Sequence, residues 1–147
     1  MFAVPSAFYA AGLLRRDLYM QHTFLLAGEA VLDSEILTAV MKNITRRQFP
    51  RDVPSGGNFS DTWFKKTAGL PGGIGGFPSG HTIAAFSVGA VFADRYSNPA
   101  WHRWVAYGLA ALVAFSRMPL EAHFASDVVA GGALAYITAH YVVLSAP

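Results

Sequence analysis

Five stretches of the chain are rich in apolar residues, and polar or glycine-rich segments separate them. Each is longer than an ordinary strand, and none alternates strictly between apolar and polar positions, so the pattern predicts helices. The predicted helices cover residues 1–14, 20–41, about 79–94, about 104–117 and about 123–145.

The fold class predicted from these segments is all-α, a membrane-embedded bundle of about five helices in one domain spanning 1–147. Hydrophobic residues make up 53% of the chain and charged residues 14%, against about 25% charged residues in an ordinary soluble domain. The second segment carries Glu29, Asp33 and Glu35, so at least one of its faces must turn away from lipid.

The first segment, "MFAVPSAFYAAGLL", is short for a span of about 20 residues. Its positive charges, Arg15 and Arg16, follow the apolar stretch, whereas a signal peptide carries them in front. The segment is either interfacial, or the chain begins partway through a longer protein and lacks upstream helices.

Charge and cysteine content exclude some functions. The net charge of +2, from 11 basic and 9 acidic residues, predicts no nucleic-acid partner. The chain has no cysteine, which excludes disulfides and thiolate metal sites.

The order of the segments predicts where polar groups meet. If each segment crosses the membrane once, the 43–78 and 118–122 connections lie on the same side. We therefore expect Lys42, Ser79–His81 and Arg117–His123 to converge at one membrane face, where the active site would lie.

The third segment opens with "GGFPSGHT", residues 75–82. A helix N-terminus has unpaired N–H groups that suit an anion, and Gly80 lets the backbone approach it closely. Ser79 can add a hydroxyl donor, and His81 lies in the first turn. The alternative is a simple helix start with Ser79 as its N-cap.

The stretch "SRMPLEAHFASD", residues 116–127, places His123 and Asp127 four residues apart on one helical face. A carboxylate bonded to one imidazole nitrogen would leave the other free as a nucleophile. Arg117 is suited to phosphate oxygens. An ordinary His–Asp pair is one alternative. A metal site is another, although His102 falls on the opposite side and Arg117 would repel a cation.

The stretch "KNITRRQFPRD", residues 42–52, adds Lys42, Arg46, Arg47 and Arg51 at the end of the second helix. Cations there could bind an anion, or they could simply lie at the membrane edge.

Together the three stretches resemble the type 2 phosphatidic acid phosphatase superfamily, whose pattern is K-x6-R-P, P-S-G-H and S-R-x5-H-x3-D. The second and third motifs match completely, at Pro78, Ser79, Gly80 and His81 and at Ser116, Arg117, His123 and Asp127. In the first motif Lys42 and Pro50 match, but Phe49 stands where the family has arginine. We expect Arg47, two residues earlier, to supply the missing charge, with Arg46 and Arg51 as less favoured alternatives.

The resemblance implies a role for each matching residue. His123 would attack phosphorus to form a phosphohistidine, Asp127 would hold His123, and His81 would protonate the leaving oxygen. No metal or other cofactor is implied. The phosphoryl oxygens would be bound by Lys42, Arg47, Ser79, Gly80 and Arg117.

The predicted function is hydrolysis of a lipid phosphate monoester or diphosphate, in a bacterial inner membrane with the site on the extracytoplasmic face. Three alternatives stay open: a soluble periplasmic acid phosphatase, a vanadate haloperoxidase of the same superfamily, and a catalytically impaired membrane protein that binds lipid phosphates.

Overall fold

The computed structural model describes residues 9–10, 12–65 and 75–145, and every regular element within them is a helix. The all-α prediction is therefore confirmed, while residues 1–8 and 11 of the predicted first helix lie outside the described residues. The helices are α2 (Leu18–Thr45), the short η1 (Pro50–Asp52), α3 (Gly80–Arg95), α4 (Trp101–Phe115), α5 (Ala125–Thr138) and the π-helical η2 (Ala139–Val143) that continues α5.

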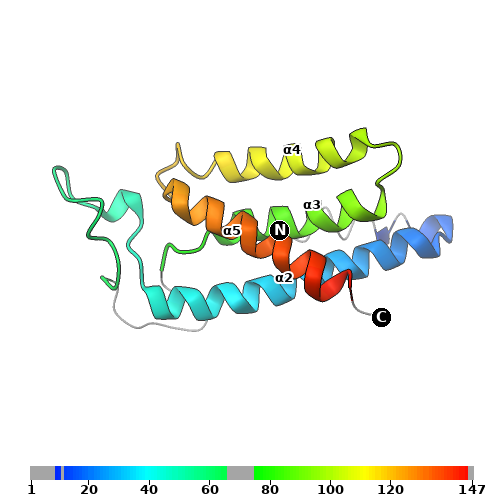
Figure 1. The fold of residues 1–147 in the computed structure, drawn as a ribbon, viewed down its shortest axis with the longest axis horizontal. Coiled ribbons are helices and arrows are strands. Elements are labelled where there is room, and N and C mark those ends of the chain that lie inside the picture. The colour runs from blue at the N-terminus through cyan, green and yellow to red at the C-terminus, as the bar shows by residue number, and fades with distance from the viewer. Residues whose placement is uncertain (1–8, 11, 66–74, 146–147) are drawn as a thin grey trace.

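The four long helices lie side by side and form an elongated bundle (Figure 1). The end of α2, the start of α3, the end of α4 and the start of α5 all gather at the left end in that view. We call this the site end. The convergence predicted from the order of the segments is confirmed.

Local sequence explains where the helices at the site end stop and start. α2 ends because Arg46 adopts a left-handed backbone conformation, with φ of 44°, while its N–H donates to the Lys42 carbonyl. α3 begins at Gly80, directly after Pro78 and the extended residue Ser79. The Ser79 hydroxyl does not cap the helix; it accepts a hydrogen bond of 3.0 Å from the Thr82 hydroxyl.

Small residues let the helices approach closely. A Cβ atom at Gly89 of α3 would lie 3.2 Å from the Ala106 carbonyl oxygen and 3.3 Å from the Ala110 Cβ of α4. A Cβ atom at Gly131 of α5 would lie 3.0 Å from the Ser79 carbonyl oxygen. The close contact at Gly131 brings the start of α3, with its Ser-Gly-His sequence, against α5.

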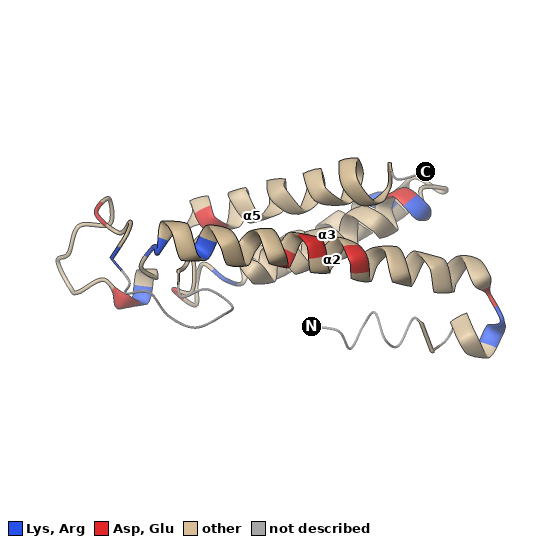
Figure 2. Ribbon diagram, turned by 90° about the horizontal axis from the view of Figure 1, so that it is seen from below, with Lys and Arg blue, Asp and Glu red and all other residues tan. Residues whose placement is uncertain are grey.

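None of the helices in the described ranges provides the length of apolar sequence that a bilayer crossing requires. Charged residues are sparse along the helices, and Lys and Arg gather toward the two ends of the bundle (Figure 2). Large apolar side chains lie exposed on α4 and α5, among them Trp104, Leu112 and Val129, each at least 66% exposed.

Candidate active site

The described residues bring every predicted site residue to the site end. Lys42 comes from the last turn of α2, and Ser79, Gly80 and His81 from the start of α3. Arg117 and His123 lie in the connection between α4 and α5, and Asp127 lies in the first turn of α5.

His123 is buried, and its ring is held by the main chain. Its Nδ1 lies 2.8 Å from the carbonyl oxygen of Gly76. A carbonyl oxygen can only accept, so Nδ1 carries the proton when the ring is neutral, and Nε2 keeps its lone pair.

The predicted hydrogen bond between Asp127 and His123 is not formed. The Asp127 Oδ2 atom lies 3.7 Å from the His123 Nδ1, which is too far for a hydrogen bond. The reason is that the carboxylate has other partners. Its Oδ2 accepts from the Phe124 N–H at 2.9 Å, and its Oδ1 forms an ion pair with the Arg47 guanidinium.

Asp127 also links two helix starts. Its side chain is fully buried, and its main-chain carbonyl accepts a 3.0 Å hydrogen bond from the Ser79 N–H. The residue therefore fixes the start of α5 relative to the start of α3, in addition to its contact with the guanidinium.

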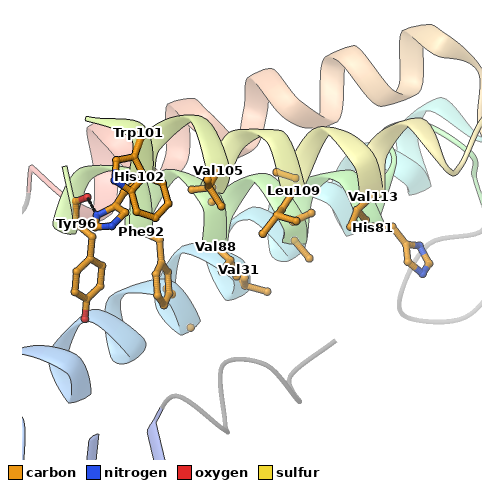
Figure 3. A pocket seen from close by; sticks show the side chains of 17 residues that line it. Val31, His81, Val88, Phe92, Tyr96, Trp101, His102, Val105, Leu109 and Val113 are labelled. Carbon is orange, nitrogen blue, oxygen red and sulfur yellow. Dashed lines mark hydrogen bonds between the residues drawn. The ribbon is translucent and has the colours of Figure 1, made fainter. Parts of the chain in front are cut away.

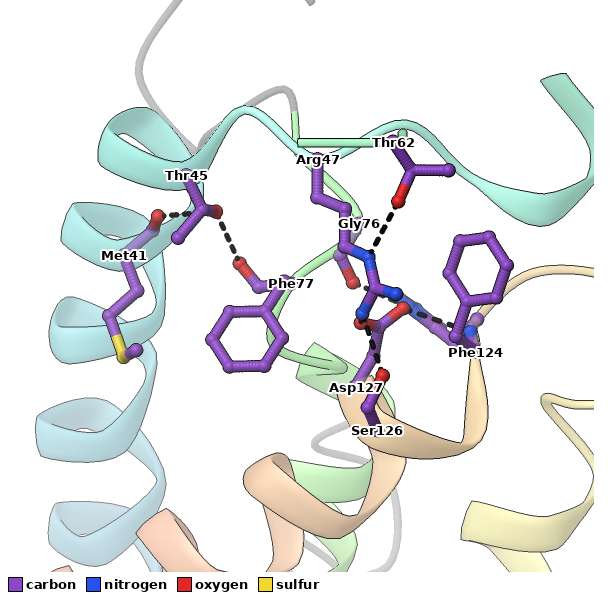
Figure 4. Close-up of polar contacts among 10 residues, drawn as sticks. Met41, Thr45, Arg47, Thr62, Gly76, Phe77, Phe124, Ser126 and Asp127 are labelled. Carbon is purple, nitrogen blue, oxygen red and sulfur yellow. Dashed lines mark hydrogen bonds and ion pairs between the residues drawn. The ribbon is translucent and has the colours of Figure 1, made fainter. Parts of the chain in front are cut away.

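Arg47 is enclosed by partners on several sides (Figure 4). Its Nε donates to the Thr62 hydroxyl at 3.2 Å, and its Nη1 donates to the Ser126 hydroxyl at 2.7 Å as well as to Asp127. The guanidinium also lies 4.4 Å from the centre of the Trp63 ring and 4.3 Å from that of Phe124.

These contacts bear on the role predicted for Arg47. Its side chain is 8% exposed, and its donors face Thr62, Ser126 and Asp127. A buried guanidinium is stable only when a carboxylate neutralises its charge, and the Asp127 carboxylate does this for Arg47. In this arrangement the donors of Arg47 are directed at Thr62, Ser126 and Asp127, and phosphate binding by Arg47 stays a prediction.

Phe49, the residue that departs from the first motif, contacts His123 directly. The two ring centres are 5.7 Å apart, and the ring planes meet at 67°. The Arg51 guanidinium lies over the Phe49 ring, 5.0 Å from its centre. Arg51 and His123 also line one cavity of about 480 Å³. An apolar wall thus stands where the motif arginine was expected.

His81 lies among cations. Burial, followed by the positive charges of Arg117, His123 and Lys42, lowers the pKa of His81 below its ordinary value of 6.5. Arg117 itself is oriented by Ser116, whose hydroxyl oxygen accepts from the guanidinium Nε at 3.0 Å and from Nη2 at 2.9 Å.

Glu35 is a site residue that the sequence patterns did not identify. A Cβ atom built at Gly80 would lie 3.4 Å and 3.6 Å from the two carboxylate oxygens of Glu35, and 3.5 Å from the Lys42 Nζ. Both side chains therefore flank the first residue of α3. The available signal was the seven-residue spacing between Glu35 and Lys42, which places them on one face of α2.

A long apolar groove of about 700 Å³ starts beside His81 and runs between α2, α3 and α4 (Figure 3). Val31, Val88, Leu109 and Val113 line its length. Its far end is formed by Tyr96, Trp101 and His102. Apart from the histidine at each end, the groove offers apolar surface along most of its walls.

Comparison with known proteins adds an independent finding. The PAP2 superfamily profile matches residues 23–147. The lipid A 4'-phosphatase of Porphyromonas gingivalis is 29% identical over 122 residues, which are 83% of this chain and 51% of that protein. The lipid A 1-phosphatase of the same organism is 37% identical over 59 residues, which are 40% of this chain and 13% of that protein.

The chain thus spans about half the length of the first of these relatives and a smaller part of the second. No solved structure gives a significant match to the chain.

Proposed function

Because the chain belongs to the PAP2 superfamily, we propose that it hydrolyses a phosphate monoester or diphosphate carried by a lipid, with His123 as the nucleophile. The observation that carries this proposal is the hydrogen bond from His123 Nδ1 to the Gly76 carbonyl. It favours the tautomer whose Nε2 lone pair can attack phosphorus.

The chemical steps follow from the placement of the two histidines. His123 Nε2 forms a bond to phosphorus while the bond from phosphorus to the lipid oxygen breaks, and His81 gives that oxygen a proton. Water then attacks the phosphohistidine, with His81 accepting a proton, and releases inorganic phosphate. Attacking and leaving atoms are in line with phosphorus in such transfers.

The remaining residues bind or position. Lys42, Arg117, the Ser79 hydroxyl and the Gly80 N–H bind the phosphoryl oxygens, because charge stabilisation is most of what phosphoryl transfer requires. Asp127, supported by Arg47, acts through its neighbours and keeps the two helix starts in register.

The groove beside His81 supports a lipid substrate. In-line attack by His123 places the leaving oxygen on the far side of phosphorus, toward His81, and His81 lines the groove. From His81 to Tyr96 the groove follows α3 for about 22 Å. One leaflet of a bilayer core is about 15 Å deep, so a lipid chain fits this length.

We place the protein in a bacterial inner membrane, with the site end at the extracytoplasmic surface. The large apolar side chains exposed on α4 and α5 support this, because extended apolar patches mark contact with lipid or with other proteins. Candidate substrates are lipid A phosphates, after the names of the relatives, and also phosphatidic acid, phosphatidylglycerol phosphate and polyprenyl diphosphate.

Phe49 favours a second candidate function, binding of lipid phosphates without turnover. Its ring occupies the wall beside His123 where the family has a cation. One experiment separates the two functions: release of inorganic phosphate from each detergent-dispersed candidate lipid, by the full-length protein and by its His123→Ala variant.

We expect release by the wild-type protein and none by the variant. We also expect an acid-labile phosphoenzyme that only the wild-type protein forms. Equal release by both proteins would refute the assignment of His123, and lipid phosphate binding without release would favour the second function.

A further inference from the structure

The Glu35 carboxylate lies beside Gly80 in the proposed phosphate site, although a negative charge there would repel an anion. The two oxygens of Glu35 lie 3.4 Å and 3.6 Å from a Cβ position at Gly80, and the Lys42 Nζ lies 3.5 Å from the same position. The Gly80 N–H at the start of α3 is one of the groups proposed to bind phosphate. Glu35 therefore lies next to the residue whose N–H is proposed to bind the substrate anion.

Glu35 is half-buried, and within the described ranges no hydrogen bond or close ion pair engages its carboxylate. Burial raises the pKa of Glu35 above its ordinary value of 4.5, and the charge of Lys42 opposes this rise. The group is thus easier to protonate than an exposed glutamate, while it remains next to a cation.

Two roles are possible for such a carboxylate, and they predict opposite effects. Glu35 could keep Lys42 charged, since burial lowers the pKa of Lys42 and the charge of Glu35 raises it. This support is not needed when substrate is bound, because the ordinary lysine pKa of 10.5 is far above neutrality and a phosphate dianion itself favours the ammonium.

The other role is direct repulsion, and it is the larger effect. Two like charges about 4–6 Å apart near a protein surface change an affinity by about tenfold or more, even after solvent screening is allowed for. A phosphate dianion carries two such charges.

We propose that Glu35 is a specificity-determining residue that makes the site bind phosphate together with one proton. The proton comes from solvent and resides either on Glu35 or on the phosphate group, so the site discriminates against a dianion beside an ionised carboxylate. The inference rests on the proposed phosphate site and adds the ionic form of the substrate that this site accepts.

Lys42 is the charged group that acts directly on Glu35, and the charged groups of the proposed site come from three elements. Lys42 lies on the same helix, His81 lies in the first turn of α3, and Arg117 and His123 lie in the connection that follows α4. His81 also loses a proton as the pH rises, which weakens anion binding in any variant that keeps it. A comparison between two proteins that differ only at Glu35 removes this contribution.

The test uses sulfate, because it stays a dianion throughout the range and its binding therefore reports only protein groups. We would measure sulfate affinity by titration calorimetry from about pH 5 to about pH 8, for the full-length protein, Glu35→Gln and Glu29→Gln. Glu29 is an exposed glutamate on the same helix, so it provides the matched control.

At pH 8 we expect Glu35→Gln to bind sulfate about tenfold more tightly than the wild-type protein. The advantage should shrink as the pH falls and Glu35 takes up its proton, and Glu29→Gln should match the wild-type protein throughout. Equal or weaker binding by Glu35→Gln at pH 8, or an advantage that does not change with pH, would overturn the inference.

Folding of each variant is checked by its helical circular dichroism, and Glu35→Ala serves as a second variant. The wild-type protein provides an additional test, because a sulfate affinity that does not fall between pH 5 and pH 8 would also contradict the inference. A sulfate affinity that does not depend on Glu35 would contradict this inference but not the proposed function. Absence of both sulfate binding and phosphate release in the wild-type protein contradicts the proposed function itself.

Discussion

Replacing Arg47 with methionine would remove the cation that neutralises a fully buried carboxylate. Asp127 has no exposed surface. Without the guanidinium, its carboxylate would still accept the 2.9 Å hydrogen bond from the Phe124 N–H, but its charge would have no counterion. Methionine fills most of the same space between the Trp63 and Phe124 rings, so the change tests charge more than packing.

The expected cost follows from this burial. Removing one partner of a buried ion pair costs about 3–5 kcal/mol, because the other charge stays buried without compensation. Loss of the two contacts between the guanidinium and the aromatic rings adds about 0.5–1 kcal/mol each, which contacts of the methionine sulfur with the same rings partly offset. We therefore expect Arg47→Met to lower the free energy of unfolding by about 3–5 kcal/mol.

Urea unfolding in mild detergent, followed by tryptophan fluorescence, measures this loss. The control is Arg51→Met, because the Arg51 side chain is 56% exposed and its pairing with Asp52 is long, at 3.9 Å; it should cost less than about 1 kcal/mol. Adding Asp127→Asn to Arg47→Met should restore about 2 kcal/mol. A loss below about 1 kcal/mol for Arg47→Met, accompanied by a higher KM, would refute the supporting role and favour phosphate binding.

Three further predictions concern the site and the packing behind it. Phe49→Arg should lower the KM for a lipid phosphate by about tenfold, because it restores a cation beside the nucleophile; an unchanged or higher KM would count against the proposed phosphate position. The value of kcat/KM, corrected for ionisation of the substrate, should fall with rising pH around a midpoint below 6.5, since the pKa of His81 is lowered and its acidic form is the proton donor; a midpoint well above 6.5 would exclude His81 as that donor. Gly131→Ala should destabilise the protein by about 1–3 kcal/mol in thermal unfolding, because its new methyl group would lie 3.0 Å from the Ser79 carbonyl oxygen. Gly132→Ala, whose nearest neighbour is 3.7 Å away, should be close to neutral, and equal losses for the two would show that packing at Gly131 is looser than described.

The helices and their convergence could be predicted because they depend on information that is local in the sequence. Apolar segments of helical length identify the elements, and alternating crossings decide which ends meet. The same reasoning predicts that Lys42, His81 and His123 lie at one end of the bundle.

The partners of the buried charges could not be predicted in this way. A spacing of four residues allows a bond between Asp127 and His123, but it cannot show that Arg47 and the Phe124 N–H take the carboxylate instead. The Phe124 N–H is a local partner three residues away, but the ion pair with Arg47 depends on the distance between segments 80 residues apart. Glu35 was missed for a related reason, because its neighbour Gly80 belongs to another helix.

The tether on His123 has a consequence for how related sequences are interpreted. Its acceptor is a peptide oxygen of Gly76, and every amino acid at position 76 would carry the same oxygen. A substitution at position 76 can therefore abolish this hydrogen bond only by displacing the segment of main chain that bears the oxygen. A pseudoenzyme could thus arise in this family with all its motif residues intact. Whether a relative has kept its chemistry is better judged from the path of its main chain before the Pro-Ser-Gly-His motif than from the motif itself.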